Sequence, residues 1–429
     1  MTSPVTPRNP DDLTHEGAAA APSVIGRALW ILLPLSIFGL FVLQGGVVSV
    51  LLGRQVAAQY SDRESVGVLG AVLAVAALVG LISQPVWGRL SDRGSGRWLG
   101  RRNTWVLGGS LAAIPLLLAL AVVENVVVIT VLFALSTSAT SAVAVAVSTA
   151  LPERVPIARR GSMSGALAVC QMVGLIAGVA LAGAGGIMFG YFAVLVVFVA
   201  TSSAFAFLAR DPSRTTESVD VVRQPTEPGR RFPAWGEARD FYMAAAGRFL
   251  ILFGASSALG FLLYMLRDYV RVGDGSIEAA TEALVPLTAV NGVFTLISAA
   301  IGGYLADRFA RLKIFVVISS LLLVPSAVIL FFVPTMTGMY VAAAVLGLGL
   351  GTYLSVDQAL VAMVLPSKGG AGNDLGLINI ANTLPSVLAP AVAGGLVTLT
   401  GSFRPVFVVM AISVTLGALT VRYISDAVR

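Results

Sequence analysis

Charged residues, cysteine and histidine are all scarce in this sequence of 429 residues. Only 12% of the residues are charged and 57% are hydrophobic, whereas soluble domains average about 25% charged residues. The single cysteine, Cys170, excludes a disulfide within the chain and cannot build a metal site alone. The only histidine, His15, lies in a polar N-terminal segment, so zinc chemistry and histidine-based catalysis are not expected. We therefore expect no metal site, no cofactor and no catalytic residue.

Long apolar runs account for the hydrophobic composition. A helix needs about 20 apolar residues to cross the hydrocarbon core of a bilayer. Runs of this length predict an all-α membrane protein with twelve transmembrane helices. The predicted spans are 29–52, 66–88, 104–123, 127–150, 163–183, 187–208, 242–266, 284–306, 314–333, 337–364, 377–400 and 403–424.

Basic residues are distributed unevenly among the connections between these spans. With twelve spans both termini lie on one side, and the segments on that side hold 22 of the 28 Lys and Arg residues. Cytoplasmic loops carry an excess of such residues, so we expect cytoplasmic termini and a multi-pass protein of the cell (inner) membrane. This topology signal explains the net charge of +6 better than nucleic-acid binding does. One exception, Arg248, lies within span 7, and five lie in the connections on the other face: Arg54, Arg63, Arg267, Arg271 and Arg404.

Two sequence landmarks recur at nearly the same spacing. Gly88-Arg-Leu-Ser-Asp-Arg93 follows span 2, and Gly303-Tyr-Leu-Ala-Asp-Arg308 follows span 8. Leu151-Pro152 after span 4 likewise matches Leu365-Pro366 after span 10. Parallel repeats of six helices are typical of transporters, with the solute site between the halves near mid-membrane. We predict a disordered N-tail (1–28), a six-helix bundle (29–208), a cytosolic linker (209–241), a second bundle (242–424) and a C-tail (425–429).

These motifs resemble those of the major facilitator superfamily, whose loop motif between spans 2 and 3 reads Gly-x-Leu-x-Asp-Arg. The stretched form of the loop, ending in Leu99-Gly100-Arg101-Arg102, is similar to that of the glycoside–pentoside–hexuronide and sucrose-type cation symporters. Leu151-Pro152-Glu153-Arg154 and Val356-Asp357-Gln358-Ala359-Leu360 resemble the same group. The resemblance implies two pseudo-symmetric six-helix bundles in the major facilitator fold.

The resemblance also implies that the loop motif acts as a conformational latch between the halves. Glycine allows another helix to approach closely, and an aspartate at a helix end favours a positive dipole end. The alternative is that these residues only set the topology. The predicted latch residues are Gly88, Asp92, Arg93, Arg101, Arg102, Gly303, Asp307 and Arg308.

Asp357 is the acid that lies deepest within a predicted span. An ionised Asp inside a membrane costs about 2.5–3.5 kcal/mol on insertion scales, so it must face the bundle interior, pair or be protonated. Arg248 lies at a similar depth in span 7. We therefore predict an Arg248–Asp357 ion pair that breaks and reforms during proton coupling. The alternatives are a structural acid and an arginine that extends to the cytosol.

Neutral polar side chains within the spans are the candidate solute ligands. Amides and hydroxyls suit an uncharged sugar or polyol, although many such groups only join helices together. The candidates are Gln44, Gln171, Asn291, Tyr353, Gln358, Asn379 and Asn382.

The predicted function is secondary active transport by symport of a small polar solute, such as a sugar, with a proton or another cation. The alternative is a proton-antiport exporter of drugs or metabolites. An enzyme is not expected, because the sequence has no P-loop and no Ser–His or Cys–His set. The expected surroundings are membrane lipid and no nucleic acid, and the expected state is a monomer.

Overall fold

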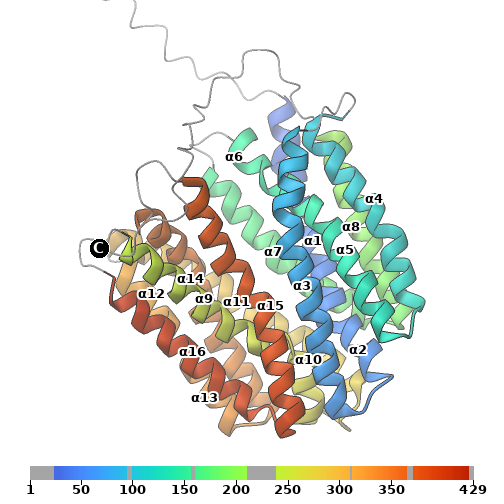
Figure 1. The fold of residues 1–429 in the computed structure, drawn as a ribbon, viewed down its shortest axis with the longest axis vertical. Coiled ribbons are helices and arrows are strands. Elements are labelled where there is room, and N and C mark those ends of the chain that lie inside the picture. The colour runs from blue at the N-terminus through green and yellow to red at the C-terminus, as the bar shows by residue number, and fades with distance from the viewer. Residues whose placement is uncertain are drawn as a thin grey trace, which may run out of the picture.

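The computed structural model describes residues 24–93, 99–155, 160–209, 238–309, 312–364 and 371–424, and their regular structure is entirely helical (Figure 1). The first half comprises α1 (Val24–Gly46), the π-helical η2 (Val47–Leu51), α2 (Leu52–Ala57), α3 (Asp62–Arg93), α4 (Arg101–Val122), α5 (Val126–Ser148), α6 (Ala150–Arg154), α7 (Arg160–Gly183) and α8 (Ile187–Leu208). The second half comprises α9 (Arg239–Leu259), α10 (Leu262–Tyr264), the π-helical η4 (Met265–Val270), α11 (Ile277–Phe309), α12 (Leu312–Leu321), α13 (Leu323–Phe332), α14 (Met336–Val364), α15 (Ala371–Thr400) and α16 (Arg404–Arg422).

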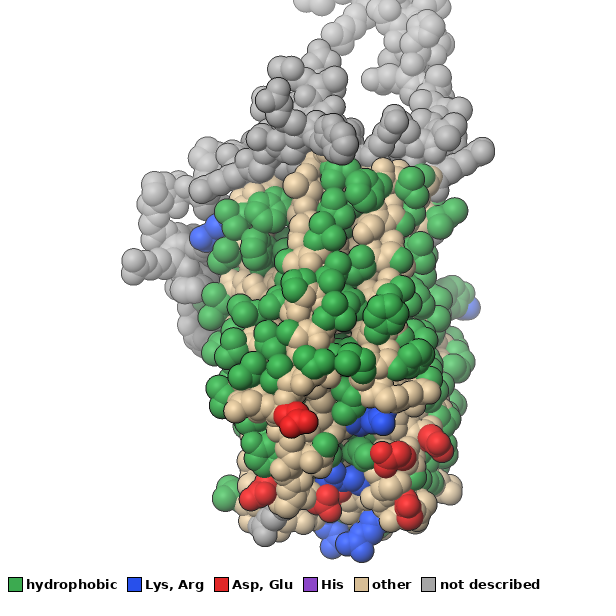
Figure 2. Space-filling model, turned by 90° about the vertical axis from the view of Figure 1, so that its right-hand side faces the viewer, with side chains coloured by type: hydrophobic (Ala, Val, Ile, Leu, Met, Phe, Trp, Pro, Cys, Tyr) green, Lys and Arg blue, Asp and Glu red, His purple; other side chains and the backbone are tan. Residues whose placement is uncertain are grey.

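Twelve helical stretches in the described part of the chain are long and apolar enough to cross a membrane, which confirms the number predicted from the sequence. Figure 2 shows a broad belt of hydrophobic side chains, with Lys, Arg, Asp and Glu side chains gathered at one end of the molecule. Side chains such as Ile31, Ile82 and Phe332 are largely exposed on the helices. Lipid would cover them, because a bilayer solvates apolar surface that water would not.

The helices pack mainly within their own half of the chain. In the first half, α1 packs against α7 and α8, and in the second half α11 packs against α14 and α9 against α16. Close approach depends on small residues, because a side chain at Gly178 would collide with the backbone of α1 at Val42. Gly347 and Gly351 have the same role between α14 and α11. The glycines of span 10 therefore serve close packing, and α14 runs through them without a break.

The two halves meet along a seam formed by α3 with α15 and by α7 with α11. We call the end at which α8 ends and α9 begins the linker end, and the end at which α3 begins and α15 ends the hairpin end. Several seam contacts lie toward the hairpin end. Gly70 of α3 lies against Pro390 and Gly394 of α15, and Gly183 of α7 lies against Thr281 of α11. In Figure 1, α3 and α15 run side by side at the lower part of the view.

The first helix of each half differs from the prediction at its ends. The helix α1 begins at Val24, within the segment predicted as the N-tail, and its membrane-spanning stretch begins at Ala28. Span 7, predicted as one helix to residue 266, ends as a regular α-helix at Leu259 and continues through α10 and η4. Span 1 continues through η2 into α2. A count of hydrophobic residues cannot distinguish a π-helical turn from an α-helical one, so the sequence did not predict η2 and η4.

Candidate functional site

A buried ion pair joins α9 and α14 in the second half of the chain. Arg248 Nη1 lies 3.0 Å from Asp357 Oδ2, and the two side chains are only 6% and 4% exposed. The contact predicted from the sequence is therefore present, although its part in proton coupling stays a prediction. Water cannot solvate these buried side chains, so each charge depends on the other for its stabilisation.

Asn382 on α15 is the third member of this group. Its Oδ1 accepts a hydrogen bond of 3.3 Å from Arg248 Nη2. Asn382 is itself exposed, whereas the Arg and Asp side chains are buried. Asn382 therefore connects the buried ion pair to an accessible side chain on α15, a helix that also packs against α3 of the first half.

Three buried polar atoms of this group make no hydrogen bond of ordinary geometry with the described residues. One is Asp357 Oδ2, although it faces Arg248 Nη1 in the ion pair. The other two are the Nε–H of Arg248 and the hydroxyl of Tyr353, which lies one helical turn before Asp357 and faces its carboxylate. Buried polar groups are nearly always satisfied in native proteins. These two groups therefore have free capacity to bind a water molecule or a polar solute.

The remaining predicted solute ligands fall into three classes. Gln44 on α1 and Gln171 on α7 are exposed in the middle of their spans. Asn291 on α11 donates a hydrogen bond of 3.0 Å to the carbonyl of Ala343 on α14, so it joins two helices as the alternative reading held. The side chains of Gln358 and Asn379 lie outside the described residues.

The predicted latch residues are only partly described. Gly88 and Gly303 are half-buried, and Gly303 lies near Ser355 of α14. Arg102 is buried, and the exposed Arg308 donates to the hydroxyl of Tyr304 on its own helix. The role of the motif in latching the halves stays a prediction. The side chains of Asp92, Arg93, Arg101 and Asp307 lie outside the described residues.

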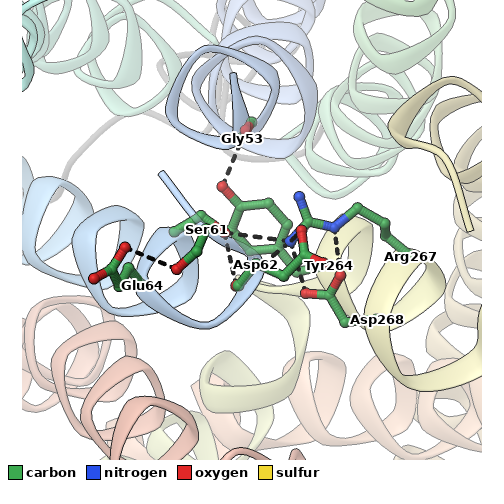
Figure 3. Close-up of polar contacts among 8 residues, drawn as sticks. Gly53, Ser61, Asp62, Glu64, Tyr264, Arg267 and Asp268 are labelled. Carbon is green, nitrogen blue, oxygen red and sulfur yellow. Dashed lines mark hydrogen bonds and ion pairs between the residues drawn. The ribbon is translucent and has the colours of Figure 1, made fainter. Parts of the chain in front are cut away.

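A second polar cluster lies at the hairpin end, and the sequence reading missed it. Figure 3 shows Arg267 of η4 between Asp268, its neighbour in sequence, and Asp62 of α3. Ser65 of α3 also accepts from Arg267, and the hydroxyl of Tyr264 donates to the carbonyl of Gly53 in α2. We call Asp62, Ser65, Tyr264, Arg267 and Asp268 the hairpin-end cluster. The sequence reading counted Arg267 only as a topology charge, and its adjacency to an acid directly after a long apolar run was the available signal.

Burial raises the pKa of Asp268 above its ordinary value, and the hydrogen bond and charge of Arg267 offset only part of that shift. Asp62, by contrast, is exposed over 81% of its side chain. The two acids that contact Arg267 therefore differ in their access to water.

The sequence and the fold of this chain are similar to those of known membrane transporters. The sequence model of the Major Facilitator Superfamily matches this chain twice, over residues 28–280 and 244–428. The crystal structure of the nucleoside transporter NupG superposes with a TM-score of 0.69 at 14% identity, covering 93% of this chain and 100% of that chain. A bacterial homologue of the human lysosomal transporter Spinster, in an inward-facing and unoccupied conformation, superposes with a TM-score of 0.64 at 13% identity, covering 94% of this chain and 95% of that chain.

At these identities the two structures establish the fold alone, and no curated protein matches the chain in sequence. The family match spans both halves and nearly all of the described residues. It agrees with the twelve apolar helices and with the resemblance of the loop motifs. The chain therefore belongs to the Major Facilitator Superfamily, as a multi-pass membrane transporter of small solutes and not an enzyme.

Proposed function

We propose that this protein is a proton-coupled secondary transporter that moves a small, uncharged polar solute, of the sugar or glycoside type, across the cell membrane. The solute would bind between the halves beside Arg248, Asp357 and Asn382. Alternating access would expose this site first to one side of the membrane and then to the other. The exporter that works by proton antiport is the competing hypothesis.

The observation that carries the proposal is the buried Arg248–Asp357 pair. Arg248 on α9, Asp357 on α14 and the neighbouring Asn382 on α15 all belong to the second half of the chain. A rigid-body movement of one half against the other would therefore leave their contact intact. Breaking it requires chemistry, either protonation of Asp357 or a solute that replaces one partner, and such a dependence is what couples a proton to a solute.

The chemistry of the surrounding groups supports a neutral solute. The ion pair has no net charge, and the nearby Asn382 amide and Tyr353 hydroxyl offer neutral donors and acceptors. Two exposed glutamines, Gln44 and Gln171, add further amides on the first half. Many neutral hydrogen-bonding groups suit a polyhydroxylated ligand. A nucleoside, the solute named for the similar NupG structure, has a hydroxylated sugar of this chemistry.

The test is transport by purified protein in liposomes with an imposed proton gradient. Sugars, glycosides and nucleosides are offered separately, and both solute flux and internal pH are recorded. We expect uptake with the inward proton gradient, and we expect Asp357→Asn to abolish gradient-driven uptake while solute exchange across the membrane persists. Exit of solute against the direction of proton entry would favour the antiport exporter. Uptake that does not respond to the proton gradient would reject proton coupling.

A further inference from the structure

Arg267 of the hairpin-end cluster contacts both halves of the chain at once. Its Nη2 lies 3.3 Å from Asp62 Oδ1 and donates to Ser65 Oγ at 3.3 Å, and both partners belong to α3 of the first half. The same guanidinium donates to Asp268 through Nε and, at 2.8 Å, through Nη2. Its side chain is 6% exposed. One buried cation therefore has a partner in its own half and a different partner across the seam.

The partner in its own half has a consequence for opening. If the halves separated at the hairpin end, Arg267 would lose Asp62 and Ser65 but keep Asp268. Removing the only partner of a buried charge is strongly destabilising, and Asp268 prevents that situation. Opening then loses the contact with the largely exposed Asp62, which contributes little, and one hydrogen bond to Ser65. The cluster can therefore open and close reversibly.

Tyr264 provides a second contact across the seam. Its hydroxyl donates to the carbonyl of Gly53 at 3.0 Å, and the Arg267 guanidinium lies over its ring at 4.7 Å. Leu263 lies so close to Gly53 that any added side chain there would meet it. Arg267 and Tyr264 therefore form one unit of the second half that rests against α2 and α3 of the first.

Both sides of this contact are built on π-helical turns. The turn η2 ends at Leu51, two residues before Gly53, and η4 carries Arg267 and Asp268 (Figure 3). Such turns are rare and occur frequently at functional sites. They follow the first helix of each half, at corresponding places in the two repeats.

We propose that Arg267 is a two-partner switch, with Asp268 as its permanent counter-charge and Asp62 as the partner that it releases when the hairpin end opens. The inference rests on alternating access in the proposed function, but not on the identity of the solute or the coupling ion. It assigns opposite effects to two neighbouring acids. Losing Asp62 weakens the closed state, whereas losing Asp268 leaves Arg267 dependent on Asp62 and so strengthens the closed state.

The test measures distances between spin labels in the full-length protein. The Cys170→Ser variant gives a cysteine-free background. One label pair, at the exposed Glu124 and Glu278, reports on the hairpin end, and a second pair, at the exposed Ser148 and Tyr423, reports on the linker end. Opening of the hairpin end lengthens the first distance and shortens the second.

We expect Asp62→Asn to raise the hairpin-open population about two- to fivefold, the range for an exposed ion pair. Asp268→Asn should lower it. Glu64→Gln is the matched control, because it removes the same charge from the same helical turn, and Glu64 binds Ser61 rather than Arg267. It should leave both distances unchanged.

Two outcomes would overturn the inference: equal shifts for Asp62→Asn and Glu64→Gln, or shifts of the same sign for Asp62→Asn and Asp268→Asn. If the two label pairs never change in opposite directions in any variant, with or without solute, alternating access itself fails and the proposed function fails with it. Tyr264→Phe checks the second contact independently, and it should raise the hairpin-open population without altering the charge.

Discussion

The Arg248–Asp357 pair and the Arg267–Asp62 pair use the same chemistry in two different regions. The first is buried on both sides and lies within one half of the chain. The second joins the halves, and one of its partners is 81% exposed. Movement of the halves separates the second pair and leaves the first untouched.

The comparison separates two requirements of a coupled carrier. A contact within one half responds to protonation or to solute, whereas a contact across the seam responds to the position of the halves. A transporter couples the two processes only if a change at the first shifts the balance at the second. The following predictions test whether the pairs divide the work in this way, in order of decreasing effect.

The largest effect is expected at the buried pair. Asp357→Asn or Arg248→Gln alone should lower the stability of the purified protein by about 3–5 kcal/mol, because each leaves a buried charge without its partner. The double variant should recover much of this loss. Thermal unfolding in detergent measures all three. A double variant no more stable than the single variants would show that the contact between the two charges contributes nothing.

Overpacking the seam should move the halves without touching either ion pair. A methyl group at Gly70 would lie 2.6 Å from the carbonyl oxygen of Pro390, whereas one at Gly395 would meet nothing. Overpacking typically costs about 1–3 kcal/mol. Gly70→Ala should therefore shift the population toward the hairpin-open state, as measured with the Glu124 and Glu278 labels, and Gly395→Ala should not. Identical distances in the two variants would contradict the seam described here.

Removing the Tyr353 hydroxyl should have opposite effects on stability and on binding. A buried, unpartnered hydroxyl costs about 1–3 kcal/mol, so Tyr353→Phe should be at least as stable as the parent protein. If the solute uses this hydroxyl, the KM for transport should rise about tenfold, the loss expected for one hydrogen bond. An unchanged KM would remove Tyr353 from the solute site.

The smallest effect is the pH dependence of the hairpin-end cluster. Because burial raises the pKa of Asp268, the folded protein binds this proton more tightly than the unfolded chain does. The stability from this group is therefore present at low pH and is lost as the pH rises through the raised pKa. We expect Asp268→Asn to weaken the dependence of the melting temperature on pH in this range. Glu124→Gln, which removes an exposed acid at the same end, should leave that dependence unchanged. A parallel change in both variants would argue against a special environment for Asp268.

The architecture and one of the two pairs could be predicted from the sequence. Span length, loop charge and the repeated motifs report on solvation and chain order, which are local properties. Arg248 and Asp357 could be paired because both lie deep in apolar runs, where a charge requires a partner. The partner of Arg267 could not be predicted, because Arg267 follows the end of a hydrophobic run and resembles any solvated loop charge. Its contact with Asp62 exists only through the docking of two segments 205 residues apart, which no local pattern encodes.

The π-helical turns determine where the chain leading into the hairpin end tolerates the loss of a residue. A π-helical turn holds an additional residue compared with an α-helical turn, and successive residues in an α-helix are rotated by about 100° around its axis. Deleting one residue within Met265–Val270 would convert the turn to an α-helix and leave the residues beyond it at nearly the same rotation, because the full turn is then completed with one residue fewer. The same deletion in the regular helix α9 (Arg239–Leu259) would rotate everything beyond it by about 100° and carry Arg267 away from α3.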